Sequence, residues 1–164
     1  MEIWDAYKKD GNKAGIDLYR GSPIPDGLFH IVSEVLVKHK DGSILVMQRD
    51  WHKEEHAGLF EASASGSILK GETPYQGAVR ELREETGIVS NDLTFIHAQS
   101  NMRDTIYYGF LCIADCPKDS IILQESETIS YRWLSKTEFL SFINSMEFMV
   151  SQRNRWLPFL DKII

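Results

Sequence analysis

The residues best able to do chemistry are three glutamates near the middle of the chain. Glu81, Glu84 and Glu85 are spaced i, i+3 and i+4, so on a helix their side chains share one face. Three like charges on one stripe repel each other by about 0.2–0.5 kcal/mol per exposed pair. A hard divalent cation offsets that repulsion by taking the carboxylate oxygens as ligands. Bound magnesium also leaves room in its coordination shell for phosphate oxygens. The triplet alone is also typical of a solvated acidic helix face, so the choice depends on the neighbouring residues.

A glycine loop precedes the triplet. Gly66 and Gly71 bracket a short segment, and Glu72 follows at once. Glycines let the chain turn sharply and bring a backbone oxygen close to a ligand. Glu72 can pair with Arg80 or help to cap the start of the helix. We therefore expect a structural role for Arg80 and a ligand-binding role for the loop.

Local patterns predict the helices. Thr73 followed by Pro74 is a helix start and Gly87 is a helix stop, so we expect a helix over 74–86. A capping box at 135–138 predicts a helix that continues to about 146. A last helix is expected over 150–157, ended by Pro158.

Apolar and β-branched runs predict the strands. They lie at 2–8, 16–20, 28–38, 43–49, 93–99, 105–114 and 128–134. The Asp41-Gly42 pair predicts a tight hairpin between two of them. Strands with a few interspersed helices predict an α/β fold, in which helices flank a mixed sheet. Residues 1–27 are expected to form an N-terminal hairpin attached to it.

Composition limits the class of protein. The chain has 164 residues, which suits one domain over 1–164, and a net charge of −6, which disfavours a nucleic-acid polymer as partner. Its two cysteines lack a second pair at zinc spacing, so we expect a reduced, cytoplasmic protein. We expect no membrane partner, because no apolar run approaches spanning length. A small phosphorylated ligand stays possible, since a cation can bridge two anions.

The loop and helix together resemble the Nudix box. Every fixed position of that pattern is matched, by Gly66, Glu72, Arg80, Glu81, Leu82, Glu84, Glu85, Gly87 and Ile88. The chain is identified on these residues as a member of the Nudix family. The resemblance implies an α/β/α sandwich whose box, residues 66–88, binds Mg²⁺ or Mn²⁺. It also implies hydrolysis of a diphosphate that links a nucleoside to another group X, or of a related organic diphosphate.

The resemblance assigns roles to particular residues. The metal ligands it implies are the Gly66 carbonyl and the carboxylates of Glu81, Glu84 and Glu85. A further acid from a later loop often assists in the family, and Glu127 fits that place best. Glu125 is the runner-up. The catalytic candidates are therefore Glu84, Glu85 and Glu127, and either Glu84 or Glu127 would take the proton from water. Members of the family are often homodimers.

The front of the chain resembles the branch that contains isopentenyl diphosphate isomerase, notably along 60–66. Those isomerases need a cysteine just before the box glycine and a histidine just after it, whereas this chain has Ser65 and Ser67. A hydroxyl is a far weaker acid and nucleophile than a thiol. We therefore expect hydrolysis on an isomerase-like scaffold. The isomerase itself and a non-catalytic nucleotide-binding module are the alternatives.

Residues outside the box are weaker candidates. Arg49 and Glu61 are the candidate substrate-binding residues. An inverted zinc-protease pattern at 52–56 follows a strand directly, so we expect a loop there instead of a metal site. Four aromatic side chains could stack on a base or pack in the core: Phe60, Tyr107, Tyr108 and Phe110. Arg153 and Arg155 are expected to be surface charges.

Overall fold

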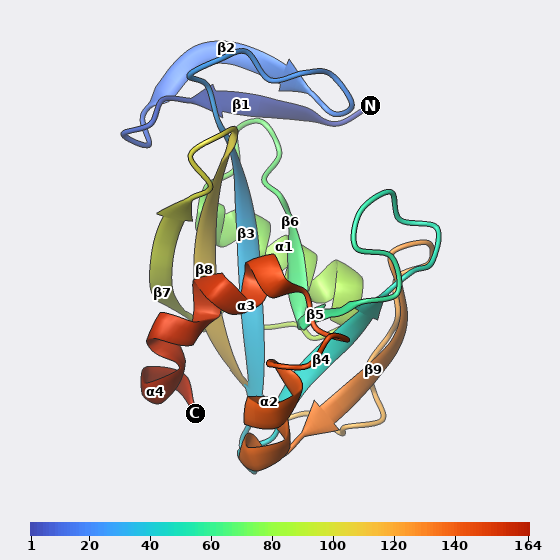
Figure 1. Cartoon of the computed structure of the whole chain (residues 1–164). Helices are drawn as coiled ribbons and strands as arrows, with labels where there is room; N and C mark the ends of the chain where they lie inside the picture. The colour runs from blue at the N-terminus through green and yellow to red at the C-terminus, as the bar shows by residue number, and fades with distance from the viewer.

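A mixed sheet with helices on both faces forms the body of the molecule (Figure 1). The computed structural model describes residues 1–164. Its strands are β1 (Ile3–Tyr7), β2 (Lys13–Tyr19), β3 (His30–His39), β4 (Ile44–Arg49), β5 (Phe60–Ala62), β6 (Ala64–Ser67), β7 (Leu93–Ser100), β8 (Thr105–Ala114) and β9 (Thr128–Leu134). Its helices are α1 (Pro74–Thr86), α2 (Lys136–Phe142), α3 (Val150–Trp156), the short 3₁₀ turn η1 (Leu157–Phe159) and α4 (Leu160–Ile163).

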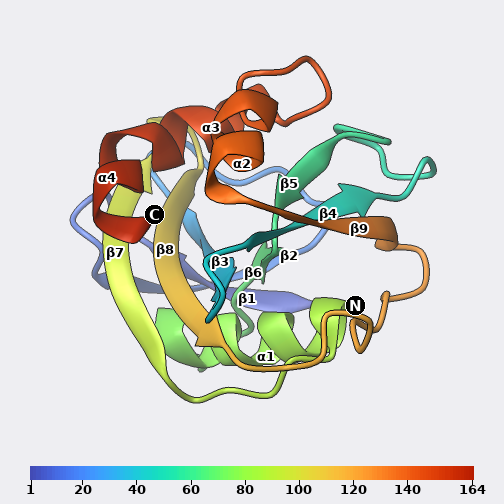
Figure 2. The same cartoon turned by 90° about the horizontal axis from the view of Figure 1, so that it is seen from below.

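The main sheet has the order β5-β4-β3-β8-β7. Strands β3 and β8 are parallel, and the other pairs are antiparallel. Figure 2 shows α1 along one face of the sheet and the C-terminal helices along the other. One apolar core packs α1, through Ala78 and Leu82, against the sheet. A second core packs Phe139 and Trp156 of α2 and α3 against its other face. This arrangement confirms the expected α/β/α sandwich.

The sheet divides beside β3. Strands β3 and β4 are joined by the Asp41-Gly42 turn but pair only at Lys38 and Ile44. Further along, β6 takes the free edge of β3, while β5 and β9 pair with β4. Buried Ser63 spans the division, because its hydroxyl accepts from the Val37 N–H and donates to the Leu45 carbonyl, both at 2.8 Å. The division leaves an opening between the two cores.

The N-terminal hairpin of β1 and β2 lies across one end of the main sheet (Figure 1). It is attached to the loop before α1, where the Lys70 N–H donates to the Ile3 carbonyl at 2.8 Å. The Gly71 N–H donates to the Asp5 carboxylate, also at 2.8 Å. Trp4 stacks on His30 with ring centroids 4.7 Å apart. The expected hairpin is thus present, and it fixes the glycine loop from outside.

Three features differ from the expectations. The short strands β5 and β6 were not anticipated in the sequence, because Ser63 and the glycine at 66 obscure their pattern. Helix α2 ends at Phe142, short of residue 146, because the chain turns back to bury Phe148 and to pair on both sides of Phe60. Pro158 does not end the helical region; it occupies the first turn of η1, where a missing N–H costs nothing. No helix of the molecule has the length and apolar character needed to cross a membrane.

A buried histidine on β7 makes the fold sensitive to acid. His97 is 3% exposed, and both of its ring nitrogens lack hydrogen-bond partners. It packs between Trp156 and Phe159, with ring centroids 4.9 and 5.0 Å away. Burial, helped by the charge of Arg155, lowers the pKa of His97 to about 4. The unfolded chain therefore binds a proton at His97 at pH values where the folded chain does not.

We expect the protein to lose stability as pH falls from about 6.5 toward 4, because the unfolded state gains that proton first. A His97→Leu variant lacks the titrating group, so its melting temperature should fall less over the same range. Between pH 7 and pH 5, the melting temperature of the native protein should fall by roughly 5 °C more than that of the variant. Thermal melts at a series of pH values measure it, and parallel profiles for the two proteins would contradict the role given to His97.

Candidate active site

Helix α1 is fixed at both ends by its own sequence. Thr73 and Gln76 form a reciprocal capping box, and Gly87 ends the helix in the left-handed conformation with φ 74°. Ala78 and Leu82 are fully buried against the sheet. The helix therefore presents a fixed face to the division between β3 and β4.

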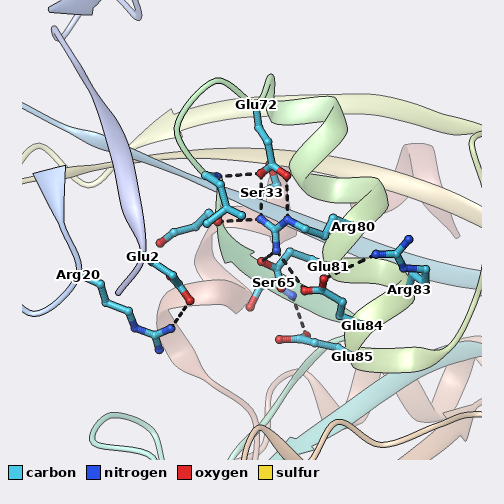
Figure 3. Close-up of polar contacts among 12 residues, drawn as sticks. Glu2, Arg20, Ser33, Ser65, Glu72, Arg80, Glu81, Arg83, Glu84 and Glu85 are labelled. Atoms are coloured by element: carbon cyan, nitrogen blue, oxygen red, sulfur yellow. Dashed lines mark hydrogen bonds and ion pairs between the residues drawn. The ribbon is translucent and has the colours of Figure 1, made fainter. Parts of the chain in front are cut away.

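Arg80 ties the glycine loop to the helix (Figure 3). Its guanidinium donates to both carboxylate oxygens of Glu72, at 2.8 and 2.9 Å, and to the Ser67 carbonyl at 3.0 Å. It also reaches Glu81 at 2.5 Å and Glu84 at 3.2 Å. The pairing with Glu72 raises the pKa of Arg80 further, so the arginine stays charged. The structural role expected for Arg80 matches these contacts.

Two of the three glutamates are buried. Glu85 is 5% exposed and Glu81 is 9% exposed, whereas Glu84 is more open. Burial raises the pKa of Glu85 well above its usual range, and the neighbouring carboxylate of Glu61 raises it further. Burial also raises the pKa of Glu81, although Arg80 opposes the change. The Ser65 N–H donates to Glu85 at 3.0 Å. These carboxylates therefore lack enough positive charge around them.

The glutamates open onto a cleft of about 410 Å³. It lies at the division of the sheet, between α1 and α3, and residues of the N-terminal hairpin border it. Eight glutamates line it, against five basic side chains, so the cleft carries net negative charge. Every one of those basic groups is paired with a carboxylate. An anionic ligand would need added cations to enter.

The other expected site residues also line this cleft. Glu127 pairs with Lys53, and the side chains of Arg49 and Glu61 are 2.7 Å apart. Glu61 also accepts from the Ser65 hydroxyl at 2.8 Å. Glu125, the runner-up to Glu127, is exposed and lies outside the cleft. The structure thus brings Gly66, Glu81, Glu84, Glu85, Glu127, Arg49 and Glu61 together around one opening.

The donor set fits a hard divalent cation. Glu81, Glu84, Glu85 and the Gly66 carbonyl offer oxygen atoms alone, which Mg²⁺ and Mn²⁺ prefer. Glycine at 66 lets the Glu81 carboxylate lie against the backbone, because a Cβ there would lie 2.2 Å from the Glu81 carboxyl carbon in its present position. No group of three acidic, histidine or cysteine side chains is already arranged around one point. Binding an ion would therefore require the glutamates to turn inward, away from Arg80.

The remaining candidates fall into the core or the surface. Phe60 and Phe110 are buried in the two cores. Tyr108 packs against the core beneath α1 and against a small cluster that contains Tyr7 and Phe29, whereas Tyr107 lines the cleft. The segment 52–56 forms turns and no helix, as expected. His52 is exposed and pairs with Asp50.

Sequence reasoning missed a second group of cleft residues. Arg155, expected at the surface, has a side chain only 14% exposed and pairs with Glu34 on β3. Gln152 is fully buried beside them. The expectation for Arg155 was wrong because α3 turns this residue toward the sheet. A signal did exist: Glu34 is the only charged residue in the apolar run 31–37.

Comparison with known proteins identifies the family of the chain. The NUDIX domain family matches residues 29–157. A Nudix hydrolase of Listeria monocytogenes is 32% identical over 155 residues, covering 91% of this chain and 89% of that protein. The isopentenyl-diphosphate Delta-isomerase of Salmonella heidelberg is 28% identical over 123 residues, covering 71% of this chain and 66% of that protein. The chain therefore belongs to the Nudix family of pyrophosphohydrolases, with isomerase relatives as expected.

A solved structure confirms the fold. The crystal structure of DR0079 from Deinococcus radiodurans matches with a TM-score of 0.76 and 18% sequence identity. The match covers 94% of this chain and 98% of that one. The N-terminal hairpin lies outside the family match, which starts at residue 29.

We expect Glu85→Gln to raise the melting temperature of the protein without divalent cations, by several degrees, because it removes a buried charge. The same variant should lose the increase of roughly 5–10 °C that saturating Mn²⁺ gives the native protein. Glu54→Gln changes an exposed loop glutamate outside the cleft and is the matched control. An undiminished Mn²⁺ effect in Glu85→Gln would contradict the metal-binding role.

Proposed function

We propose that this protein hydrolyses the diphosphate bond of a nucleoside diphosphate linked to another group X, or of a related organic diphosphate, with Mg²⁺ or Mn²⁺. The observation that carries the proposal is the pair of buried carboxylates, Glu81 and Glu85, beside Glu61 in a cleft of net negative charge. Such a cleft binds a diphosphate only together with cations. The complete Nudix box supports the same assignment.

The residues of the cleft have separate roles in the proposed reaction. The Gly66 carbonyl and Glu81, Glu84 and Glu85 would hold the cation. When bound, that cation neutralises the diphosphate oxygens and lowers the pKa of the attacking water. Glu84 or Glu127 accepts the proton of that water. Arg80 positions the glycine loop through its bonds to Glu72 and Ser67.

Arg49 and Lys53 are the groups that could contact the substrate's phosphates. Both line the cleft, but each is paired, with Glu61 and Glu127 respectively. Lys53 comes from the loop between β4 and β5. A substrate phosphate that drew Lys53 away would release the Glu127 carboxylate to accept a proton. Substrate binding would then make Glu127 available as the base in the cleft.

Isomerisation of isopentenyl diphosphate is disfavoured by the residues flanking Gly66. The Ser65 hydroxyl donates to Glu61 at 2.8 Å, and the Ser67 hydroxyl lies 3.2 Å from His30. Neither position holds the thiol or the imidazole that the isomerases of the resembling branch have there. A module that only binds nucleotides is disfavoured because every fixed box residue is present.

An activity screen tests the reaction type. The panel contains ADP-ribose, nucleotide sugars, dinucleoside polyphosphates, nucleoside triphosphates and isopentenyl diphosphate, each with and without Mg²⁺. We expect cation-dependent release of a monophosphate from at least one member, and labelled water identifies the phosphorus that is attacked. Formation of the allylic isomer from isopentenyl diphosphate, with no hydrolysis of any compound, would overturn the proposal.

Substitutions test the residue roles. Glu84→Gln, Glu85→Gln and Glu127→Gln should each lower kcat by about 10²–10⁴-fold, because each removes a cation ligand or the proton acceptor. Glu125→Gln is the matched control for Glu127→Gln and should leave kcat unchanged, since that residue lies outside the cleft. Steady-state kinetics and circular dichroism measure activity and folding. Near-normal kcat in a folded Glu127→Gln protein would remove Glu127 from the mechanism.

A further inference from the structure

A buried ion pair stands on the cleft wall formed by β3 and α3, and the proposed hydrolysis does not use it. Arg155 Nε lies 3.1 Å from both carboxylate oxygens of Glu34, and Arg155 Nη2 donates to the same carboxylate. Glu34 is 1% exposed. Both residues line the cleft that the acidic helix borders.

A contribution to the stability of the fold does not by itself explain the presence of this ion pair. Burial raises the pKa of Glu34, and the bonds from Arg155 only oppose that rise. An apolar pair of similar volume is often at least as stabilising as a buried ion pair. Ionisable groups that are buried in a cleft wall are typical of functional sites. The pair therefore points to recognition of a ligand.

The surroundings of Arg155 fix its orientation. The guanidinium carbon lies 3.8 Å from the centre of the Tyr107 ring, which comes from β8. The bonds to Glu34 use Nε and Nη2, so Nη1 is the nitrogen without a protein partner, on a side chain that lines the cleft. A guanidinium held between a ring and a carboxylate is a planar donor with a set direction. Lysine could not reproduce this geometry.

Gln152 holds this wall together. Its side-chain oxygen accepts from the Ala62 N–H at 2.5 Å, and its side-chain nitrogen lies 3.5 Å from Glu34. Gln152 is fully buried. It thus links α3 to β5 beside the ion pair, and the recognition surface is fixed before any ligand binds.

The wall lies close to the catalytic side of the cleft. Glu34 is in register with Ser65 across the β3–β6 pair, and the Ser65 N–H donates to Glu85. Paired residues in an antiparallel ladder have Cα atoms about 4.5–5.5 Å apart. A group attached to a diphosphate at the acidic helix would therefore reach Arg155.

The chemistry of the wall selects the kind of group. Glu34 neutralises Arg155, so the subsite does not favour a further phosphate. Only 4 of the 24 residues that line the cleft are hydrophobic, so an isoprenoid chain would cover polar groups without satisfying them. A planar ring with hydrogen-bond acceptors can accept from Nη1 and stack on the guanidinium or on Tyr107.

We propose that Arg155, held in place by Glu34 and Tyr107, binds the nucleobase of the substrate and selects nucleoside diphosphate derivatives over isoprenoid diphosphates. The proposal rests on the diphosphate hydrolysis proposed above, because it names the substrate class of that site. It makes Arg155 a specificity-determining residue.

Binding of free nucleosides tests the subsite without catalysis. Adenosine, guanosine, cytidine and uridine are each titrated into the full-length, cation-free protein, and chemical-shift changes give the affinity. The double variant Glu34→Gln with Arg155→Gln avoids an unpaired buried charge and should bind the preferred nucleoside at least tenfold more weakly. Arg155→Lys, which retains the charge, should also bind it more weakly. Arg153→Gln, on the same helix but outside the cleft, is the control and should bind as the native protein does.

Kinetics with two substrates separates recognition from a structural role. The double variant should lose at least tenfold in kcat/KM, mainly through KM, on the best nucleoside diphosphate derivative. Its rate on methyl diphosphate, which has no ring to reach the wall, should not change. Equal losses on both compounds, no binding of any nucleoside by the native protein, or a native preference for isoprenoid diphosphates would each overturn the proposal. If the native protein hydrolyses no diphosphate, the proposed function fails, and the nucleoside titration alone decides the subsite.

Discussion

Repulsion among the buried carboxylates of Glu81, Glu85 and Glu61 is the constraint on which the rest of the site depends. Each is placed there by a regular element, two by α1 and one by β5, so the backbone keeps the three residues close together even when a side chain turns. Arg80 compensates part of the charge but is itself bound to Glu72 and the loop. The site therefore favours a ligand that brings positive charge with it, and a complex of divalent cation and diphosphate has that property.

The division of the sheet forms the cleft onto which these carboxylates open. Because β3 leaves β4 after one residue pair and takes β6 as its neighbour, an opening forms between the two cores. Ser63 satisfies the backbone groups that the division would leave unpaired. The acidic helix borders one side of the opening, and α3 borders the other. Reaction and recognition can thus use opposite walls of one cleft.

The acidic wall of the cleft could be predicted from the sequence, whereas the wall that α3 forms could not. Caps and periodicity fixed the limits of α1, since Thr73, Pro74 and Gly87 act locally. The strand pattern failed at β5 and β6, because their course depends on partners distant in the chain. The second wall was missed for the same reason. Arg155 is polar and near the terminus, and only tertiary packing on Glu34 and Tyr107 buries it.

A crystal structure of the protein with Mn²⁺, in which anomalous scattering locates the ion, tests the metal-binding role of the glutamates directly. We expect an ion bound by the Gly66 carbonyl and the carboxylates of Glu81, Glu84 and Glu85, with Glu81 and Glu84 released from Arg80. Full occupancy of Mn²⁺ elsewhere, with Glu81 and Glu84 still bonded to Arg80, would contradict this metal-binding role.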